Sequence, residues 1–217
     1  MQIIFKILLT LHIIGGALGL VTGTINLVRK KGDKNHKRTG KLFVYGMLTA
    51  GFSSLMLSIL HPNYFLFIVG VFTVYLVGTG NRYTSLKMLS FDQKPAIIDW
   101  LLTIGMLVAG LVFVGLGVYH LLDNNIFGIV FIVFGVIGLG SVKSDMDNYR
   151  GKAKAKNYWL LIHIARMTGG YISALTAFLV VNGNYLPAAI PSTLLWLLPT
   201  LILTPLIIVW TRKYKVK

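Results

Sequence analysis

The chain has 217 residues, and it contains no cysteine, no glutamate and few charged residues of any kind. The lack of cysteine excludes disulfides, thiolate catalysis and zinc or iron–sulfur sites held by cysteine. Charged residues make up 12% of the chain, about half of the share found in ordinary soluble domains. Hydrophobic residues make up 55% and the mean hydropathy is +0.74. This composition is typical of a polytopic membrane protein.

Motifs for common reactions are also missing. The chain has no GxSxG, no HExxH and no pair of carboxylates suited to glycoside chemistry. The glycine- and lysine-containing segment 32–41 does not match the phosphate-loop pattern and follows no predicted strand. The sequence therefore assigns no catalytic residue, and a non-enzymatic role is favoured.

Seven apolar stretches approach the roughly 20 residues that a helix needs to cross a bilayer. They are Ile3–Leu27, Leu42–Leu60, Tyr64–Gly80, Ala96–Leu122, Ile126–Val142, Tyr158–Val181 and Ala188–Trp210. The first is too long for a signal-peptide core, so we expect it to be retained as a helix. Because the connecting loops are too short for a soluble domain, residues 1–217 are predicted to form a single all-α transmembrane domain.

The basic residues indicate an orientation. Nineteen of the 21 Lys and Arg residues lie in the segments RKKGDKNHKRTGK, NRYTSLKMLSFDQK, KSDMDNYRGKAKAK and TRKYKVK. These segments alternate with three loops that contain no Lys or Arg. Such asymmetry predicts that the N-terminus is outside and the C-terminus cytosolic, in a bacterial cytoplasmic membrane. The net charge of +15 is thus attributed to topology and to attraction of anionic lipid heads, not to nucleic acid.

Glycines and prolines suggest how the helices pack. Gly15, Gly19 and Gly23 recur every four residues, which lets two helix backbones approach closely. We interpret this stripe as packing within one chain; a homodimer seam is the alternative, and the oligomeric state stays open. Pro199 and Pro205 predict a kink in the last helix or, alternatively, a discontinuous helix that lines a binding site.

Arg166 is the most informative residue, because it lies in the apolar segment LLIHIARMTGGYISALTAFLVV. A guanidinium stays charged at physiological pH, and burying it in hydrocarbon costs roughly 2.5–3.5 kcal/mol on insertion scales. It should therefore face the bundle interior and find a partner. We predict Asp99 as that partner, with Asp145 as the competitor. Such a pair is either a structural ion pair or part of a ligand or proton site.

A polar pocket open to the cytosol is predicted around Arg166. His163 and Ser173 lie on the same helical face as Arg166, and the predicted lining also includes His36 and Asp99. Arg166 would offer positive charge to an anionic group, and His163 would exchange a proton near neutral pH.

The five histidines raise the question of haem or metal binding. Two histidines at matched depth on facing helices would hold a b-type haem, and His61 with His120 is the best match. His36 with His163 matches only if the second helix starts early. A metal site formed by His12, His61 and His120 is a further alternative.

The segments LHIIGGALGLVTGTINL, HKRTGKLFVYGM and HIARMTGGYISALTAFLVVN carry a family resemblance that covers most of the chain. The chain resembles a bacterial family of multi-pass membrane proteins of unknown function, common in Bacteroidetes-type genomes. The resemblance singles out His12, His36, Gly40, His163 and Arg166, and it implies no activity.

Three classes of function follow from these observations. The first is a protein that binds or moves a small anionic ligand, a lipid head or a proton. The second is an electron-transfer protein that carries haem b. The third is a non-catalytic membrane subunit or scaffold.

Overall fold

The computed structural model describes all residues except 1, 90, 154, 186, 188–191 and 217. The described residues form helices and no strands, which confirms the predicted all-α fold of seven long helices. The helices are α1 (Gln2–Val28), α2 (Lys34–Leu60), α3 (Tyr64–Arg82), α4 (Ile97–Leu122), α5 (Gly128–Tyr149), α6 (Tyr158–Val181) and α7 (Ser192–Tyr214), with a 3-10 turn at Gly183–Tyr185.

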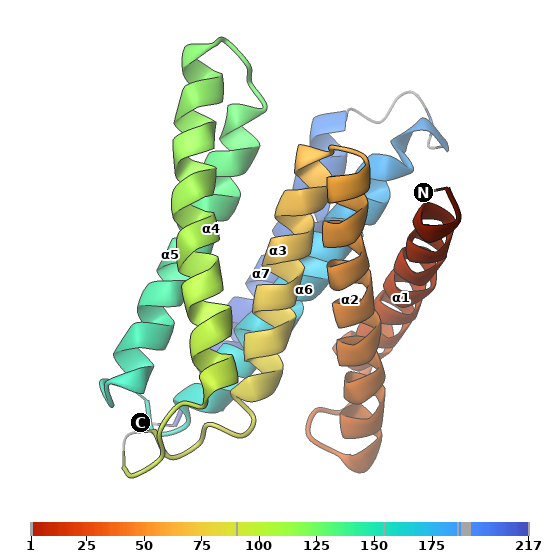
Figure 1. Ribbon diagram of the computed structural model, residues 1–217. Helices are drawn as coiled ribbons and strands as arrows, with labels where there is room; N and C mark the ends of the chain where they lie inside the picture. Colours follow the sequence, from red (N-terminus) through yellow and green to blue (C-terminus); the bar gives the residue numbers. More distant parts are fainter. Residues whose placement is uncertain (1, 90, 154, 186, 188–191, 217) are drawn as a thin grey trace.

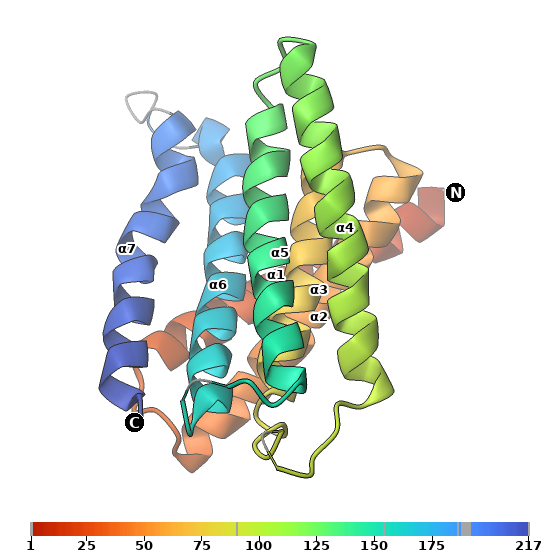
Figure 2. The ribbon, with the colours of Figure 1, turned by 90° about the vertical axis from the view of Figure 1, so that its left-hand side faces the viewer.

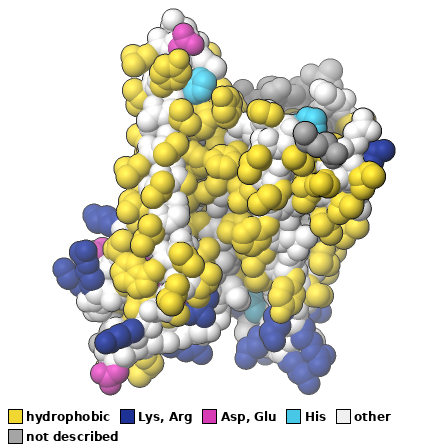
Figure 3. Space-filling model, viewed as in Figure 1, with side chains coloured by type: hydrophobic (Ala, Val, Ile, Leu, Met, Phe, Trp, Pro, Cys, Tyr) yellow, Lys and Arg dark blue, Asp and Glu magenta, His cyan; other side chains and the backbone are white. Residues whose placement is uncertain are grey.

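All seven helices are long and apolar enough to cross a membrane. Large hydrophobic side chains cover the outside of the bundle; Ile97 and Leu122 at the two ends of α4 are each 80% exposed. Such a surface is unfavourable in water and suits contact with lipid. In the space-filling view the hydrophobic side chains cover the middle, while those of Lys and Arg gather at the lower end, called the basic end below (Figure 3). The fold is that of a multi-pass membrane protein.

The helices form two groups. α1 packs on α2, α2 on α3, α3 on α6 and α6 on α7, whereas α4 and α5 form a hairpin that packs mainly on itself and more sparsely on α3 (Figures 1 and 2). The chain starts and ends at opposite ends of the bundle (Figure 1). The α4–α5 hairpin is therefore attached to the other five helices by few contacts.

Close backbone contact joins α1 to α2. A Cβ atom added to Gly15 would lie 2.7 Å from the carbonyl oxygen of Gly46, and one added to Gly46 would lie 2.7 Å from the carbonyl oxygen of Gly15. Gly19 and Gly23 instead face side chains, those of Met47 on α2 and Tyr171 on α6. The interpretation of this stripe as packing within one chain is confirmed.

α2 begins eight residues before the predicted start at Leu42. Asp33 caps it: its carboxylate accepts a hydrogen bond of 2.6 Å from the backbone N–H of His36. The polar first turns were excluded from the predicted span because they lack apolar residues, yet they continue the same helix. His36 thus lies in the first turn of α2.

We expect Asp33→Ala to lower the free energy of unfolding by about 0.5–2 kcal/mol, because the N–H of His36 would lose its acceptor. Thermal unfolding of the purified protein measures this change. Asp33→Asn is the matched control, since asparagine caps a helix about as well as aspartate. Equal losses in both variants would contradict the capping role.

Candidate functional site

Arg166 forms a buried ion pair with Asp145. Its Nη1 donates to Oδ2 of Asp145 at 3.0 Å and its Nη2 to Oδ1 at 2.7 Å. Nη2 also donates to the backbone carbonyl of Ser141 at 2.9 Å. The side chains of Arg166 and Asp145 are 5% and 0% exposed. By helical rise, Arg166 lies about 12 Å inside the start of α6, and the pair is buried within the bundle.

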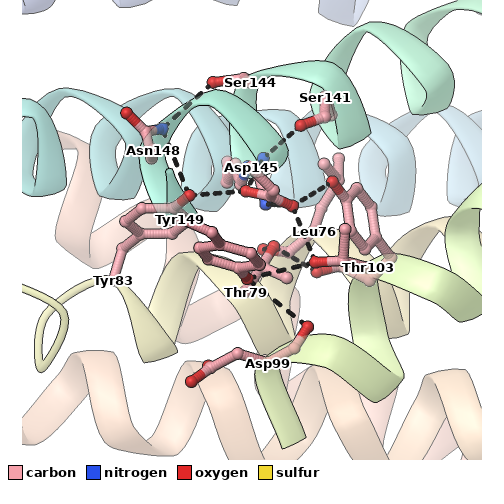
Figure 4. Close-up of polar contacts among 12 residues, drawn as sticks. Leu76, Thr79, Tyr83, Asp99, Thr103, Ser141, Ser144, Asp145, Asn148 and Tyr149 are labelled. Atoms are coloured by element: carbon pink, nitrogen blue, oxygen red, sulfur yellow. Dashed lines mark hydrogen bonds and ion pairs between the residues drawn. The ribbon is translucent and has the colours of Figure 1, made fainter. Parts of the chain in front are cut away.

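Three hydroxyl groups complete the surroundings of Asp145 (Figure 4). Tyr75 donates to Oδ2 at 2.6 Å, Tyr83 donates to Oδ1 at 2.7 Å and Thr103 donates to Oδ2 at 3.2 Å. The rings of both tyrosines also lie about 5 Å from the Arg166 guanidinium, at 5.0 and 5.3 Å. The carboxylate is therefore fully hydrogen-bonded, which makes its burial tolerable.

We call Asp145, Arg166 and the three hydroxyl residues Tyr75, Tyr83 and Thr103 the polar cluster. It connects α3, α4, α5 and α6. Thr103 also contacts the Tyr149 hydroxyl at 3.1 Å, and Asn148 donates to Tyr83 at 3.3 Å. The first of these bonds lies within the α4–α5 hairpin, and the second joins the hairpin to the end of α3. At the basic end the ring of Tyr83 belongs to a buried cluster with Leu86, Leu89 and Tyr158, which covers the carboxylate there.

The predicted pairing of Arg166 with Asp99 is wrong. Asp99 instead accepts hydrogen bonds from Nε and Nη2 of Arg82, at 2.7 and 2.9 Å, and from the backbone N–H of Ala96 at 2.8 Å. Asp99 thus holds the end of α3 at the start of α4. The competitor, Asp145, wins because α5 continues seven residues past the predicted end at Val142, and these extra turns place Asp145 opposite Arg166.

A groove of about 430 Å³ lies beside Arg166 and is lined by residues of α3, α5, α6 and α7. In the bundle α6 lies between α5 and α7 (Figure 2). We call this groove the α5–α7 groove. It is lined by Phe72 and Leu76 of α3; Ile137, Gly140, Ser141 and Ser144 of α5; Ile162, Ala165, Arg166, Gly169 and Ile172 of α6; and Thr200, Thr204 and Ile207 of α7. Several of these residues, including Ile137, Gly140 and Thr200, are exposed on the outside of the bundle. The groove therefore opens on the lipid-facing flank.

Of the predicted pocket residues, only Arg166 lines this groove. Nδ1 of His163 donates to the carbonyl oxygen of Gly80 at 2.8 Å, which joins α6 to α3. Ser173 is buried, and its hydroxyl has no hydrogen-bond partner among the described residues. The buried Nδ1 of His36 likewise has no partner in the described part of the chain.

His12, His61 and His120 have different neighbours. His61 packs edge-on against Phe5, with ring centroids 4.5 Å apart, whereas His120 stacks on Phe131 at 5.5 Å. Nδ1 of His12 donates to the carbonyl oxygen of Ala50 at 3.0 Å and so joins α1 to α2. The described residues contain no group of three His, Cys, Asp or Glu side chains that could hold a metal.

The basic segment between α1 and α2 contains one lysine with a structural role. Nζ of Lys31 donates to the carbonyl oxygens of Asn26, Leu27 and Arg29 at 2.8, 2.6 and 3.1 Å and lies 4.5 Å from the ring of Trp210. Burial lowers the pKa of Lys31. Its neighbours Lys30, Lys34, Lys37 and Arg38 are exposed.

Sequence reasoning missed Tyr75, Thr103, Ser141 and Ser144. A signal for part of the cluster was present, because Ser141, Asp145 and Tyr149 recur every four residues and so share one helical face. Chemically, the arrangement offers hydrogen-bond donors at the edge of an apolar groove. Comparison with protein-family models, curated proteins and solved structures finds no match for this chain, so its function is argued from this geometry.

Proposed function

We propose that the protein binds an amphiphile dissolved in the membrane, with the apolar chain in the α5–α7 groove and the polar head at Arg166. The observation that carries the proposal is the position of Arg166: this residue, whose buried guanidinium pairs with Asp145, lines a largely apolar groove that opens on the flank of the bundle. Most ligand sites combine an apolar lining with a few polar groups that orient the ligand.

The distribution of side chains along the groove supports this orientation. Ser144, Ser141 and Arg166 lie toward the basic end of the groove, where Ile162 and Ile207 also line it. Ile137 is seven residues before Ser144 on α5, about 10 Å farther from that end by helical rise. Phe72 of α3 also lines the groove, and its ring packs against that of Phe134, three residues before Ile137. A ligand with its head toward the basic end would thus place its chain near Ile137 and Phe72, with Thr200 and Thr204 of α7 also in the lining.

The two prolines of α7 fit the same proposal. Pro199 and Pro205 lie inside one continuous helix, and the neighbouring Thr200 and Thr204 line the groove. Proline removes a backbone hydrogen bond and prevents close regular packing in the preceding turn. A distorted α7 would keep space open between itself and α5.

Orientation and location belong to the proposal as well. We place the basic end in the cytosol and the protein in a bacterial cytoplasmic membrane, because basic residues are enriched in cytoplasmic loops. Exposed lysines and arginines at that end would also attract anionic lipid heads, by about 1 kcal/mol per residue near the surface.

Filling the groove should abolish ligand binding without unfolding the protein. A Cβ atom on Gly140 would have no neighbour within 4 Å, so Gly140→Leu projects a side chain into the groove without a clash. Gly105→Leu on α4 is the matched control, since Gly105 is equally open and lies outside the groove lining. Native mass spectrometry of the protein released from nanodiscs would count bound lipid-like molecules. We expect their loss in Gly140→Leu and retention in Gly105→Leu.

Two results would contradict the proposal. If native and Gly140→Leu proteins carry the same bound molecules, the groove is not the site and the polar cluster serves only to join helices, as in a scaffold. A Soret band in the purified protein would favour the haem alternative and direct attention to His36 and His163.

A further inference from the structure

The electrostatics of the α5–α7 groove restrict the kind of head group it would hold. This inference rests on the proposed function. Among the described residues that line the groove, Arg166 is the one that carries a charge. Asp145 neutralises that charge through two hydrogen bonds of 2.7 and 3.0 Å. The groove therefore offers a strong donor but no net positive charge.

Asp145 is not free to release the guanidinium. Besides Arg166, it accepts hydrogen bonds from Tyr75, Tyr83 and Thr103, and it is completely buried. An anionic head that took the guanidinium from Asp145 would leave a buried carboxylate without its counter-charge. An anionic head that left the pair intact would itself be buried without a counter-charge. Both outcomes are strongly unfavourable at membrane depth.

An uncharged acceptor avoids both penalties. The contacts with Asp145 and Ser141 use three of the five N–H groups of the guanidinium, counted among the described residues. The lining also contains the hydroxyl-bearing side chains of Ser141 and Ser144. A carbonyl oxygen can accept from such donors and brings no charge into the groove.

We infer that the ligand of the α5–α7 groove is an amphiphile whose head is an uncharged hydrogen-bond acceptor, such as an ester, amide or quinone carbonyl. Arg166 would orient this head, and the Arg166–Asp145 pair would select against phosphate, sulfate and carboxylate heads. This differs from the first expectation, in which Arg166 supplied charge to an anion.

Amphiphiles with the same chain and different heads test the inference. Methyl hexadecanoate, hexadecyl sulfate and hexadecyltrimethylammonium would be titrated into the protein in phosphatidylcholine nanodiscs, and occupancy would be measured by native mass spectrometry. We expect the ester to bind at least about tenfold more tightly than either charged probe. Ester binding should disappear in Gly140→Leu and persist in Gly105→Leu.

A charge variant checks the electrostatic argument. Ser144 is partly exposed and makes only a weak contact of 3.5 Å with Asn148, so Ser144→Lys should fold. The added cation would give the groove a net positive charge, and we expect the preference to shift toward the sulfate probe. If Ser144→Lys keeps the same preference for the ester as the native protein, the electrostatic argument is overturned.

The outcomes separate the two proposals. Tighter binding of sulfate than ester by the native protein, lost in Gly140→Leu, would overturn the uncharged-head inference and leave the groove as the site. If Gly140→Leu leaves the binding of every probe unchanged, the proposed function itself is overturned. Solvent extraction of the protein purified from membranes, followed by mass spectrometry, would distinguish an acyl ester from an isoprenoid quinone as the natural source of the head.

Discussion

Asp145→Leu is expected to be the most damaging substitution in the polar cluster, with a loss of about 3–5 kcal/mol in the free energy of unfolding. The variant leaves the Arg166 guanidinium buried without a counter-charge, and a guanidinium cannot escape by losing its proton. It also leaves the hydroxyls of Tyr75, Tyr83 and Thr103 without their common acceptor. Thermal unfolding in one detergent would measure the loss.

Arg166→Met, which removes the other partner of the ion pair, should destabilise the protein less than Asp145→Leu. In Arg166→Met the remaining carboxyl group keeps its three hydroxyl partners, Tyr75, Tyr83 and Thr103. The double variant Asp145→Leu/Arg166→Met removes both charges and should recover part of the stability lost in Asp145→Leu. Asp99→Asn serves as the control, because it leaves unpaired the charge of Arg82, which is 31% exposed and so remains partly solvated. A double variant no more stable than Asp145→Leu would show that the charges do not act as a pair.

Gly15→Leu is expected to separate α1 from α2, with a loss of more than about 1–3 kcal/mol, the usual range for overpacking. The added Cβ atom would lie 2.7 Å from the carbonyl oxygen of Gly46 and 3.0 Å from the backbone nitrogen of Ala50. Backbone atoms cannot rotate away as a side chain can, so the helices themselves must move. Unfolding temperature and protease sensitivity of the purified protein measure the effect.

The adjacent glycine gives a close control. Gly16 is on the same helix, and a Cβ atom there would have no neighbour within 4 Å. Gly16→Leu gains the same helix propensity as Gly15→Leu but meets open space. Similar stability of the two variants would exclude close packing as the reason for glycine at position 15.

Sequence alone predicts the fold well, because crossing a bilayer requires apolar length and the seven stretches supply it. The inward orientation of Arg166 was also predictable, since an unpaired charge in lipid is so unfavourable. Its partner was not, because choosing between Asp99 and Asp145 requires the end of α5 and the rotation of each helix. Both depend on contacts between helices, which the hydropathy of one segment does not contain.

The groove and the hydroxyl partners of Asp145 could not be predicted from the sequence for a related reason. Tyr75 and Thr103 are ordinary residues of apolar helices until α3 and α4 bring them to the same carboxylate. His36 illustrates the limit at helix ends. Its place in the first turn of α2 depends on one hydrogen bond to Asp33, which a hydropathy window does not detect.

The pairing of Arg166 on α6 with Asp145 on α5 has a consequence for biogenesis. The two residues belong to consecutive helices joined by a short loop, so both emerge from the ribosome close together in time. If α6 partitioned alone from the translocon into lipid, it would carry a bare guanidinium into hydrocarbon. Entering as a hairpin with α5 lets the opposite charges cancel before either meets acyl chains. The ion pair thus favours co-insertion of these two segments as the unit of membrane integration.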